Sequence, residues 1–396
     1  MLQSLELLCY VNKEKDNSVN RIPIVLQVLP ALRNGGVEKA TLDWSSILSK
    51  QNNTVPNYVV SAGGELVKVL EQFGGIHIDL PLETKNPWVM MRNACHLKKI
   101  ILQHNIQLIH ARSRAPAWSA LIAARQLRIP FITTYHGVYN SGNFLKKFYN
   151  SVMVRGDEVI AISKYIGNLV EENYQGLSSS INIVPEGTDV TIFDPAQIKD
   201  EDKKELRHLW QIPDDKYLIL LPGRLTSWKG QEVLAKALIH LSDLPICTVF
   251  LGSDQGRVKY SKRLKEMIDP SSVRFIEGCQ QMPVAYAAAD VVLSCSIEPE
   301  AYGRVTAEAL AMGRPYIGTC LGATPELCLD NVTGFLIPPK CPLSLAEKIR
   351  HVLRLSLDQK NRMGSKSRHH IVKNFSLEQM TKLTFEVYKK AIFKKF

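Results

Sequence analysis

Two glutamates, Glu300 and Glu308, stand with seven residues between them in the stretch EAYGRVTAEALAMGRP, residues 300–315. A carboxylate can accept hydrogen bonds from both hydroxyls of a ribose, as acids do in dinucleotide sites, so Glu308 is a candidate nucleoside ligand. Glu300 is placed to hold sugar hydroxyls or to face the positive charge that develops at an anomeric carbon. The structural alternative is an ion pair on a helix surface, because Arg304 lies four residues before Glu308.

Groups that bind anions accompany these acids. The helix expected after Glu300 offers free N–H groups near Gly303, Arg304 and Val305, which form an anion site at its start. Upstream, the loop LPGRLTSWKG follows an expected strand and carries Arg224 and Lys229. The planar fork of an arginine and the point charge of a lysine suit a diphosphate, and an ordinary polar loop is the alternative. A phosphate anchor beside a diol acceptor indicates a nucleoside diphosphate.

The first half of the chain contributes two weaker candidates. Gly36 follows Gly35 after the apolar run IVLQVLP, where glycines let the backbone approach a ligand closely. His136 follows the run FITTY, at the carboxyl end of an expected strand. A routine turn and a satisfied structural histidine are the alternatives. The sequence has no G-x-G-x-x-G or H-E-x-x-H motif, so we expect no dehydrogenase, no catalytic metal and no cofactor.

Short runs rich in Val, Ile and Leu alternate with helical patterns along the chain, and the alternation restarts after about residue 213. This pattern predicts an α/β protein with two doubly wound, Rossmann-like parallel-sheet domains that bind ligand at the carboxyl ends of their strands, near the cleft between them. The expected divisions are an N-terminal extension (1–20), a first domain (21–195), a linker (196–213), a second domain (214–375) and a C-terminal helix (376–396).

Charge and cysteine content narrow the class of protein. From Lys340 onward the chain has 14 Lys and Arg but 4 Asp and Glu, so +10 of its net charge of +11 lies in this segment. Such a basic segment favours an anionic neighbour: a membrane surface, a nucleic acid or an acidic substrate. A solvated basic helix is the alternative. The eight cysteines include no C-x-x-C pair, and several lie in apolar runs, so we expect buried thiols in the cytoplasm. The sequence contains no run of about 18 apolar residues, so we expect no helix that spans a membrane.

Taken together, these motifs resemble the retaining family 4 nucleotide-sugar glycosyltransferases of GT-B fold over about residues 21–390. EAYGRVTAEALAMGRP is similar to the family's E-x7-E element, and GRLTSWKG resembles its G-R-x4-K loop. PEGTDVTIFDP resembles the P-N-G-V-D segment, with Glu186 where Asn is usual. GATPEL and NVTGFLIPP resemble the closing G-G-x-P-E run, with Ala323 in place of a glycine, and NGGVEKA matches the N-terminal glycine loop.

The resemblance implies that the first domain (21–195) binds the acceptor, that the second domain (214–375) binds the nucleotide sugar, and that the C-terminal helix packs back toward the first domain. It also implies a role for each candidate residue. The donor diphosphate would be held by side chains and backbone of the second half, with Glu308 on the ribose and Glu300 on the transferred sugar. The residues implied in donor binding are Gly36, Arg224, Lys229, Gly303, Arg304, Val305 and Glu308, and those implied in catalysis are Glu300, His136, Arg224 and Lys229. Transfer would occur with retention and without a metal, and the leaving phosphate would act as base. Stabilisation of that phosphate by Arg224 and Lys229 would be the main contribution of the protein.

The acceptor is expected to bind the first half. Arg112 and Arg114, at a strand end, are candidate contacts for an anionic acceptor, and NFLKKFYNSVMVRG is basic and apolar by turns, as in membrane-surface segments. A packed amphipathic helix is the alternative. We expect a saccharide or lipid-linked acceptor, such as a lipopolysaccharide core at the cytoplasmic face of the inner membrane, and no nucleic-acid partner. A GT-B sugar epimerase or phosphorylase, a polyanion-binding protein and an inactive scaffold remain alternatives.

Overall fold

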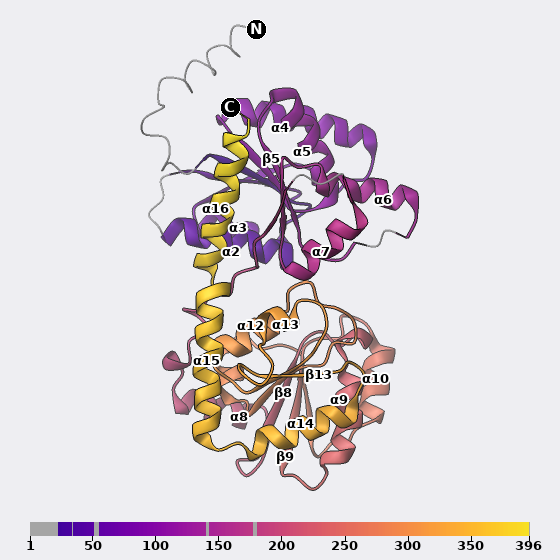
Figure 1. The fold of residues 1–396 in the computed structure, drawn as a ribbon, viewed down its shortest axis with the longest axis vertical. Helices are drawn as coiled ribbons and strands as arrows, with labels where there is room; N and C mark the ends of the chain where they lie inside the picture. The colour runs from indigo at the N-terminus through magenta and orange to yellow at the C-terminus, as the bar shows by residue number, and fades with distance from the viewer. Residues whose placement is uncertain (1–22, 34, 51–54, 140–141, 177–179, 396) are drawn as a thin grey trace. The chain divides into compact units, whose positions relative to one another are not determined.

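The computed structural model describes residues 23–33, 35–50, 55–139, 142–176 and 180–395, and the expected N-terminal extension, residues 1–20, lies outside them. The fold consists of two parallel β-sheets with helices packed on them (Figure 1). One sheet has seven strands and the other has six, and the second sheet begins with the strand at Tyr217–Pro222, after the point near residue 213 where the alternation was expected to restart. The predicted α/β class with two doubly wound parallel sheets is therefore confirmed.

The seven-stranded sheet has the order β3-β2-β1-β4-β5-β6-β7. In its middle β1 pairs in parallel with both β2 and β4, so that Val25 lies opposite Asn57 and Leu108. All four residues of β1 are buried, as a strand covered on both faces requires. The strands are β1 (Val25–Val28), β2 (Asn57–Ser61), β3 (Gly75–Asp79), β4 (Leu108–Ala111), β5 (Phe131–Tyr135), β6 (Glu158–Ala161) and β7 (Ile181–Ile183). The helices of this part of the chain are α2 (Gly36–Lys50), α3 (Val67–Gln72), α4 (Pro87–Gln103), α5 (Arg114–Leu127), α6 (Phe144–Asn150), η2 (Ser151–Val154) and α7 (Lys164–Asn173).

The six-stranded sheet has the order β10-β9-β8-β11-β12-β13. Its strands are β8 (Tyr217–Pro222), β9 (Ile246–Leu251), β10 (Val273–Ile276), β11 (Val291–Ser294), β12 (Tyr316–Thr319) and β13 (Phe335–Ile337). The order reverses between β8 and β11, which are neighbours in the sheet. In doubly wound sheets ligands bind at such a switch point, outside the carboxyl ends of the strands.

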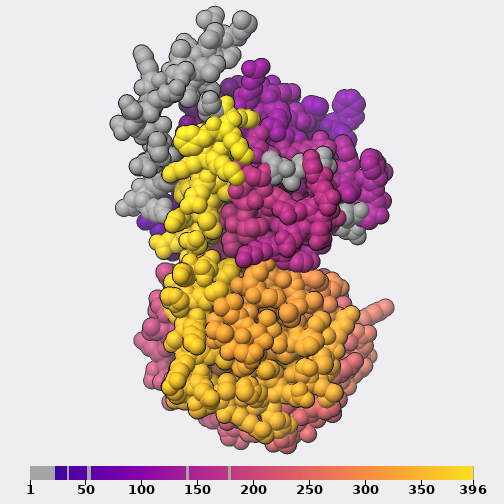
Figure 2. Space-filling view, viewed as in Figure 1, coloured from indigo at the N-terminus to yellow at the C-terminus, as the bar shows by residue number. Residues whose placement is uncertain are grey.

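Helices cover both faces of the six-stranded sheet. On one face Leu234 of α9 and Ile349 of α14 are fully buried in one apolar cluster with Phe250 of the sheet. The remaining elements include α8, which packs on α11, and α12, which packs on α15. Figure 2 shows the C-terminal helices α14 and α15, in orange and yellow, at the surface of this part of the molecule. The helices that follow β7 are η3 (Pro195–Gln197), α8 (Asp200–Leu209), η4 (Ser227–Lys229), α9 (Gln231–Leu238), η5 (Ile239–Leu241), α10 (Val258–Glu266), α11 (Met282–Ala288), α12 (Arg304–Ala311), α13 (Thr324–Leu327), α14 (Pro342–Arg354), α15 (Leu357–Phe375) and α16 (Leu377–Phe393).

The chain forms two compact units. The first comprises the described residues up to Thr133, together with Arg155–Glu158 and those of Phe385–Phe396, and the second comprises those of Thr134–Val154 and of Val159–Thr384. This grouping differs from the expected domain borders, which stay a prediction. The expected linker, residues 196–213, holds η3 and α8 and belongs to the second unit.

Candidate functional site

The loop after β8 is fixed against the carboxyl end of β11. The N–H of Ile297 donates to the carbonyl of Trp228 at 2.8 Å. Gly230 has a φ of +73°, and a Cβ there would lie 1.8 Å from the carbonyl oxygen of Cys295. Only glycine fits this close approach. The turn that carries Lys229 is thus held beside the strand end that leads to Glu300.

Lys229 and Glu300 form an ion pair in which Nζ lies 2.8 Å from Oε1, and the two side chains are only 13% and 11% exposed. The hydroxyl of Ser296 also donates to Oε1 of Glu300. The ammonium group lies 4.5 Å from the centre of the Trp228 ring, a cation–π contact. The structure therefore brings together Lys229, which the sequence predicts as a phosphate ligand, and Glu300, which it predicts as a sugar ligand. Arg224, the other predicted phosphate ligand, is exposed on the same loop.

Glu308 lies inside the second unit. Helix α12 begins after Gly303, whose φ of +101° favours glycine, and Arg304 and Val305 are its first residues. Glu308 follows one turn later with its side chain 11% exposed, and Nε of Arg304 lies 3.9 Å from its Oε1. The ion pair considered as an alternative does form, but Glu308 is not at the surface. Its contacts are those of a buried, oriented carboxylate.

Tyr286 of α11 orients Glu308 from the other side. Its hydroxyl donates to Oε2 of Glu308 at 2.9 Å. Burial, together with the nearby charge of Glu308, raises the pKa of Tyr286 well above its usual value, so the phenol keeps the proton that it donates. Tyr286 was not among the site residues predicted from the sequence, since it lies 22 residues before Glu308 in the chain.

His136 lies beside Glu186. Nδ1 of His136 is 3.0 Å from Oε1 of Glu186, and the side chains are 6% and 9% exposed. The other carboxylate oxygen, Oε2, lies 3.8 Å from Nη1 of Arg304. Glu186 was not among the site residues predicted from the sequence. The one feature of the sequence that could have pointed to it is that it replaces the asparagine usual in the P-N-G-V-D segment.

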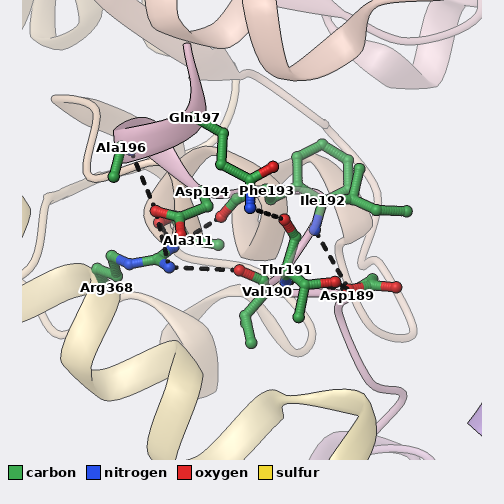
Figure 3. A network of polar contacts seen from close by, with 10 residues as sticks. All are labelled: Asp189, Val190, Thr191, Ile192, Phe193, Asp194, Ala196, Gln197, Ala311 and Arg368. Atoms are coloured by element: carbon green, nitrogen blue, oxygen red, sulfur yellow. Dashed lines mark hydrogen bonds and ion pairs between the residues drawn. The ribbon is translucent and has the colours of Figure 1, made fainter. Parts of the chain in front are cut away.

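The segment that carries Glu186 is anchored by Arg368 of α15 (Figure 3). The guanidinium donates to the carbonyl groups of Phe193 at 2.7 Å and of Ala311 at 2.9 Å. It also forms an ion pair with Asp194 at 3.0 Å. One side chain thus joins the segment after β7 to the end of α12 and to α15.

Gly36, Arg112 and Arg114 belong to the first unit. Gly36 is the first residue of α2, and Arg114 is the first residue of α5. Arg112 follows β4, is 6% exposed, and donates from Nε to Oε1 of Gln27 on β1 at 2.7 Å. This contact gives Arg112 a structural task within the sheet. The acceptor-binding role of Arg112 and Arg114 and the donor-binding role of Gly36 stay predictions.

In the described part of the chain, none of the helices has the length and apolar content needed to cross a bilayer. Nor do three or more His, Cys, Asp or Glu side chains gather there in a way that would hold a metal ion. Metal independence stays a prediction that rests on the sequence.

Known families match most of the chain. Residues 34–192 match the model described as Glycosyltransferase Family 4, and residues 202–370 match Glycosyl transferases group 1. A crystal structure of a glycosyltransferase from Rickettsia africae ESF-5 is 34% identical, with a TM-score of 0.87, over 94% of this chain and 99% of that one.

Two more distant structures share the fold. Anabaena Alr3699/HepE, solved in complex with UDP-glucose, is 21% identical with a TM-score of 0.78, over 92% of this chain and 99% of that one. WaaG, a glycosyltransferase involved in lipopolysaccharide biosynthesis, is 17% identical with a TM-score of 0.67, over 92% of this chain and 99% of that one.

The two parallel sheets and these matches define a glycosyltransferase of GT-B fold. The chain belongs to glycosyltransferase family 4, within the glycosyl transferases group 1. It is accordingly an enzyme that transfers a sugar from a nucleotide-sugar donor.

Proposed function

We propose that this enzyme transfers a hexose, with retention and without a metal, from a nucleotide-diphosphate donor to a saccharide or lipid-linked acceptor in lipopolysaccharide or other cell-envelope glycan synthesis. The observation that carries the donor part is the cluster at the switch point of the six-stranded sheet. There the Lys229–Glu300 pair, at 2.8 Å, joins the loops after β8 and β11, and Glu308 follows on α12.

In the proposed reaction the bond between the anomeric carbon and the diphosphate oxygen breaks, and the bond to the acceptor oxygen forms on the same face. The acceptor hydroxyl loses its proton to the leaving phosphate, which departs as the nucleoside diphosphate. Arg224, Lys229 and the N–H groups at the start of α12 stabilise the negative charge that develops on that phosphate. Glu308 binds the ribose, and Glu300 and His136 contact the sugar that moves.

Helix α6 supports a lipid-linked acceptor. Phe144 and Leu145 on this helix are 80% and 75% exposed, and Lys146 beside them is exposed as well. Figure 2 shows α6, in magenta, at the surface. Apolar side chains next to lysines are typical of helices that lie in the interface of an anionic membrane. We propose that the enzyme works in the cytoplasm at such a surface.

Sedimentation with vesicles tests the membrane part of the proposal. The enzyme is expected to bind vesicles that contain phosphatidylglycerol more strongly than vesicles of phosphatidylcholine alone. The double change Phe144→Ser and Leu145→Ser is expected to reduce that binding severalfold. Equal binding of wild type and variant would contradict a role of α6.

Thermal unfolding with UDP, GDP and ADP tests the donor part. A diphosphate at about 100 times its dissociation constant should stabilise the fold by roughly 2.7 kcal/mol. UDP is the first choice because the fold is shared with a protein solved with UDP-glucose. Glu308→Ala is the control and should respond less, because it lacks the ribose acceptor.

The unfolding assay and an activity assay together separate the alternatives. Stabilisation by none of the three diphosphates, together with stabilisation by heparin, would contradict nucleotide-sugar transfer and favour a polyanion-binding protein. Turnover of a sugar nucleotide that depends on inorganic phosphate, or that proceeds by isomerisation alone, would favour a phosphorylase or an epimerase.

A further inference from the structure

Glu186 and His136 form a buried carboxylate–imidazole pair. The reaction described above uses His136 but gives Glu186 no role. Oε1 of Glu186 lies 3.0 Å from Nδ1 of His136, and neither side chain is more than 9% exposed. The two residues are 50 positions apart in the sequence, so the contact is made by the fold. An ionised carboxylate has no proton to donate, so the hydrogen bond requires the proton to be on Nδ1.

The carboxylate is itself held in place. Oε2 of Glu186 lies 3.8 Å from Nη1 of Arg304, so each oxygen faces a different partner. The backbone next to it is fixed by the N–H of Thr188, which donates to the carbonyl of Phe375 at 2.8 Å. Gly187 packs so tightly on Leu377 that a Cβ would lie 2.6 Å from the Cα of Leu377. The acid is therefore oriented before any substrate arrives.

A carboxylate and an amide would act differently at this position. The amide of a glutamine or asparagine has both a donor and an acceptor end, and rotation of the group would allow either tautomer of the imidazole. A carboxylate allows only the imidazole that is protonated on Nδ1. In the neutral form of that ring Nε2 is a hydrogen-bond acceptor.

We propose that Glu186 is a positioning residue for the transfer, which keeps the proton of His136 on Nδ1 and so makes Nε2 the acceptor for a hydroxyl of the bound sugar. The proposal rests on the proposed function, because it uses the placement of His136 beside the sugar. It adds a residue that the family motif does not supply, since the motif has an asparagine here. Arg304 extends the arrangement to α12, whose Glu308 is the ribose ligand.

Nitrogen NMR of the full-length enzyme labelled on histidine rings tests the tautomer without any substrate. The signals of His136 are those missing from His136→Gln. In the wild type we expect a protonated-type shift for Nδ1 and an unprotonated-type shift for Nε2, and in Glu186→Gln a mixture of the two tautomers. A wild-type ring with a proton on Nε2, whether or not Nδ1 is protonated as well, or a pattern that Glu186→Gln leaves unchanged, would overturn the proposal.

Kinetics with UDP-glucose test whether the carboxylate of Glu186 is needed for turnover. Glu186→Gln is expected to lower kcat about 10- to 100-fold, as misplacement of a catalytic group does, with KM changed less than about threefold. In the His136→Gln background the same change is expected to have no further effect, because Glu186 acts through the imidazole. Equal losses in both backgrounds, or an unchanged kcat, would show that Glu186 does not position His136.

Asp194→Asn is the matched control. It removes a carboxylate from the same segment, where Asp194 pairs with Arg368, and makes no contact with His136 that the structure describes. It should leave the NMR pattern and kcat near those of the wild type, and melting curves of all variants identify any that fail to fold. If the wild type does not turn over UDP-glucose, the donor assignment fails, and the NMR result alone decides the proposal about Glu186.

Discussion

Lys229 and Glu300 neutralise one another in the absence of a donor. Their charged groups are 2.8 Å apart and largely shielded from water, which strengthens their attraction over that of an exposed pair. A diphosphate that reaches Lys229 must share the ammonium group with the carboxylate. Glu300 therefore affects two quantities in opposite directions: the affinity for the diphosphate and the contact with the sugar.

Glu300→Gln is expected to tighten the binding of UDP about threefold to tenfold, because the uncharged amide no longer competes for Lys229. Transfer should become slower at the same time, because the carboxylate that faces the sugar is lost. Titration calorimetry with UDP measures the first effect. Glu298→Gln, a change at an exposed acid two residues away, is the control and should leave UDP affinity unchanged. Weaker binding of UDP by Glu300→Gln would show that this pair does not limit phosphate binding.

Sequence reasoning at the residue scale identified side chains by type and spacing. Glu300, Glu308 and Lys229 could be singled out because each lies in a short motif beside an expected strand end. The contacts of Glu186 and Tyr286 could not be predicted, since each bridges loops or helices that are remote in sequence. The burial of Glu308 could not be predicted either, because the i, i+4 spacing to Arg304 is the same in a surface ion pair and in a buried one.

At the scale of elements, Arg368 connects the segment after β7 to two helices. The guanidinium has hydrogen bonds to carbonyl groups at 2.7 and 2.9 Å and an ion pair with Asp194 at 3.0 Å, and its side chain is 27% exposed. Carbonyl groups at the end of a helix have no partner within the helix, and Arg368 supplies one for Ala311.

Arg368→Met is expected to destabilise the enzyme by about 2–4 kcal/mol, because it leaves the carbonyl groups of Phe193 and Ala311 without their side-chain donor and Asp194 without its ion-pair partner, while it keeps most of the side-chain volume. Urea unfolding measures this loss. Arg362→Met on the same helix removes only an exposed pair with Asp358 and should cost less than about 1 kcal/mol. Similar losses for the two variants would contradict the role given to Arg368.

The elements themselves were largely predictable. Strands covered on both faces must be continuously apolar, so runs rich in Val, Ile and Leu mark most of the thirteen strands, whereas β3 (GIHID) is partly exposed and contains polar residues. Helix α8 was missed because its residues were interpreted as a charged linker. Three acids in its first turn, Asp200 to Asp202, and Arg207 and His208 in its last turn form the charge pattern that complements a helix dipole.

At the scale of the whole molecule, the first unit is completed by the last residues of the chain. Phe385–Phe396 belongs to this unit although the residues immediately before it belong to the second. The ring of Trp44 on α2 lies 5.0 Å from that of Phe385 and 5.5 Å from that of Tyr388, between ring centres. The hydroxyl of Tyr388, which is fully buried, shares a hydrogen bond of 2.7 Å with Nδ1 of His110 on β4. Stability of the first unit should therefore depend on a segment more than 270 residues away in sequence.

Tyr388→Phe is expected to destabilise the first unit by about 1–2 kcal/mol, because it removes a buried hydrogen bond while the ring still packs on Trp44. Hydrogen exchange should show faster exchange in β1 and β4 and little change in β8 and β11, which lie in the second unit. Lys389→Ala, at the exposed neighbouring position, is the control and should leave both regions unchanged. Faster exchange in β8 and β11 as well would mean that the two units unfold as one, and the last residues would then stabilise the donor site in addition to the first sheet.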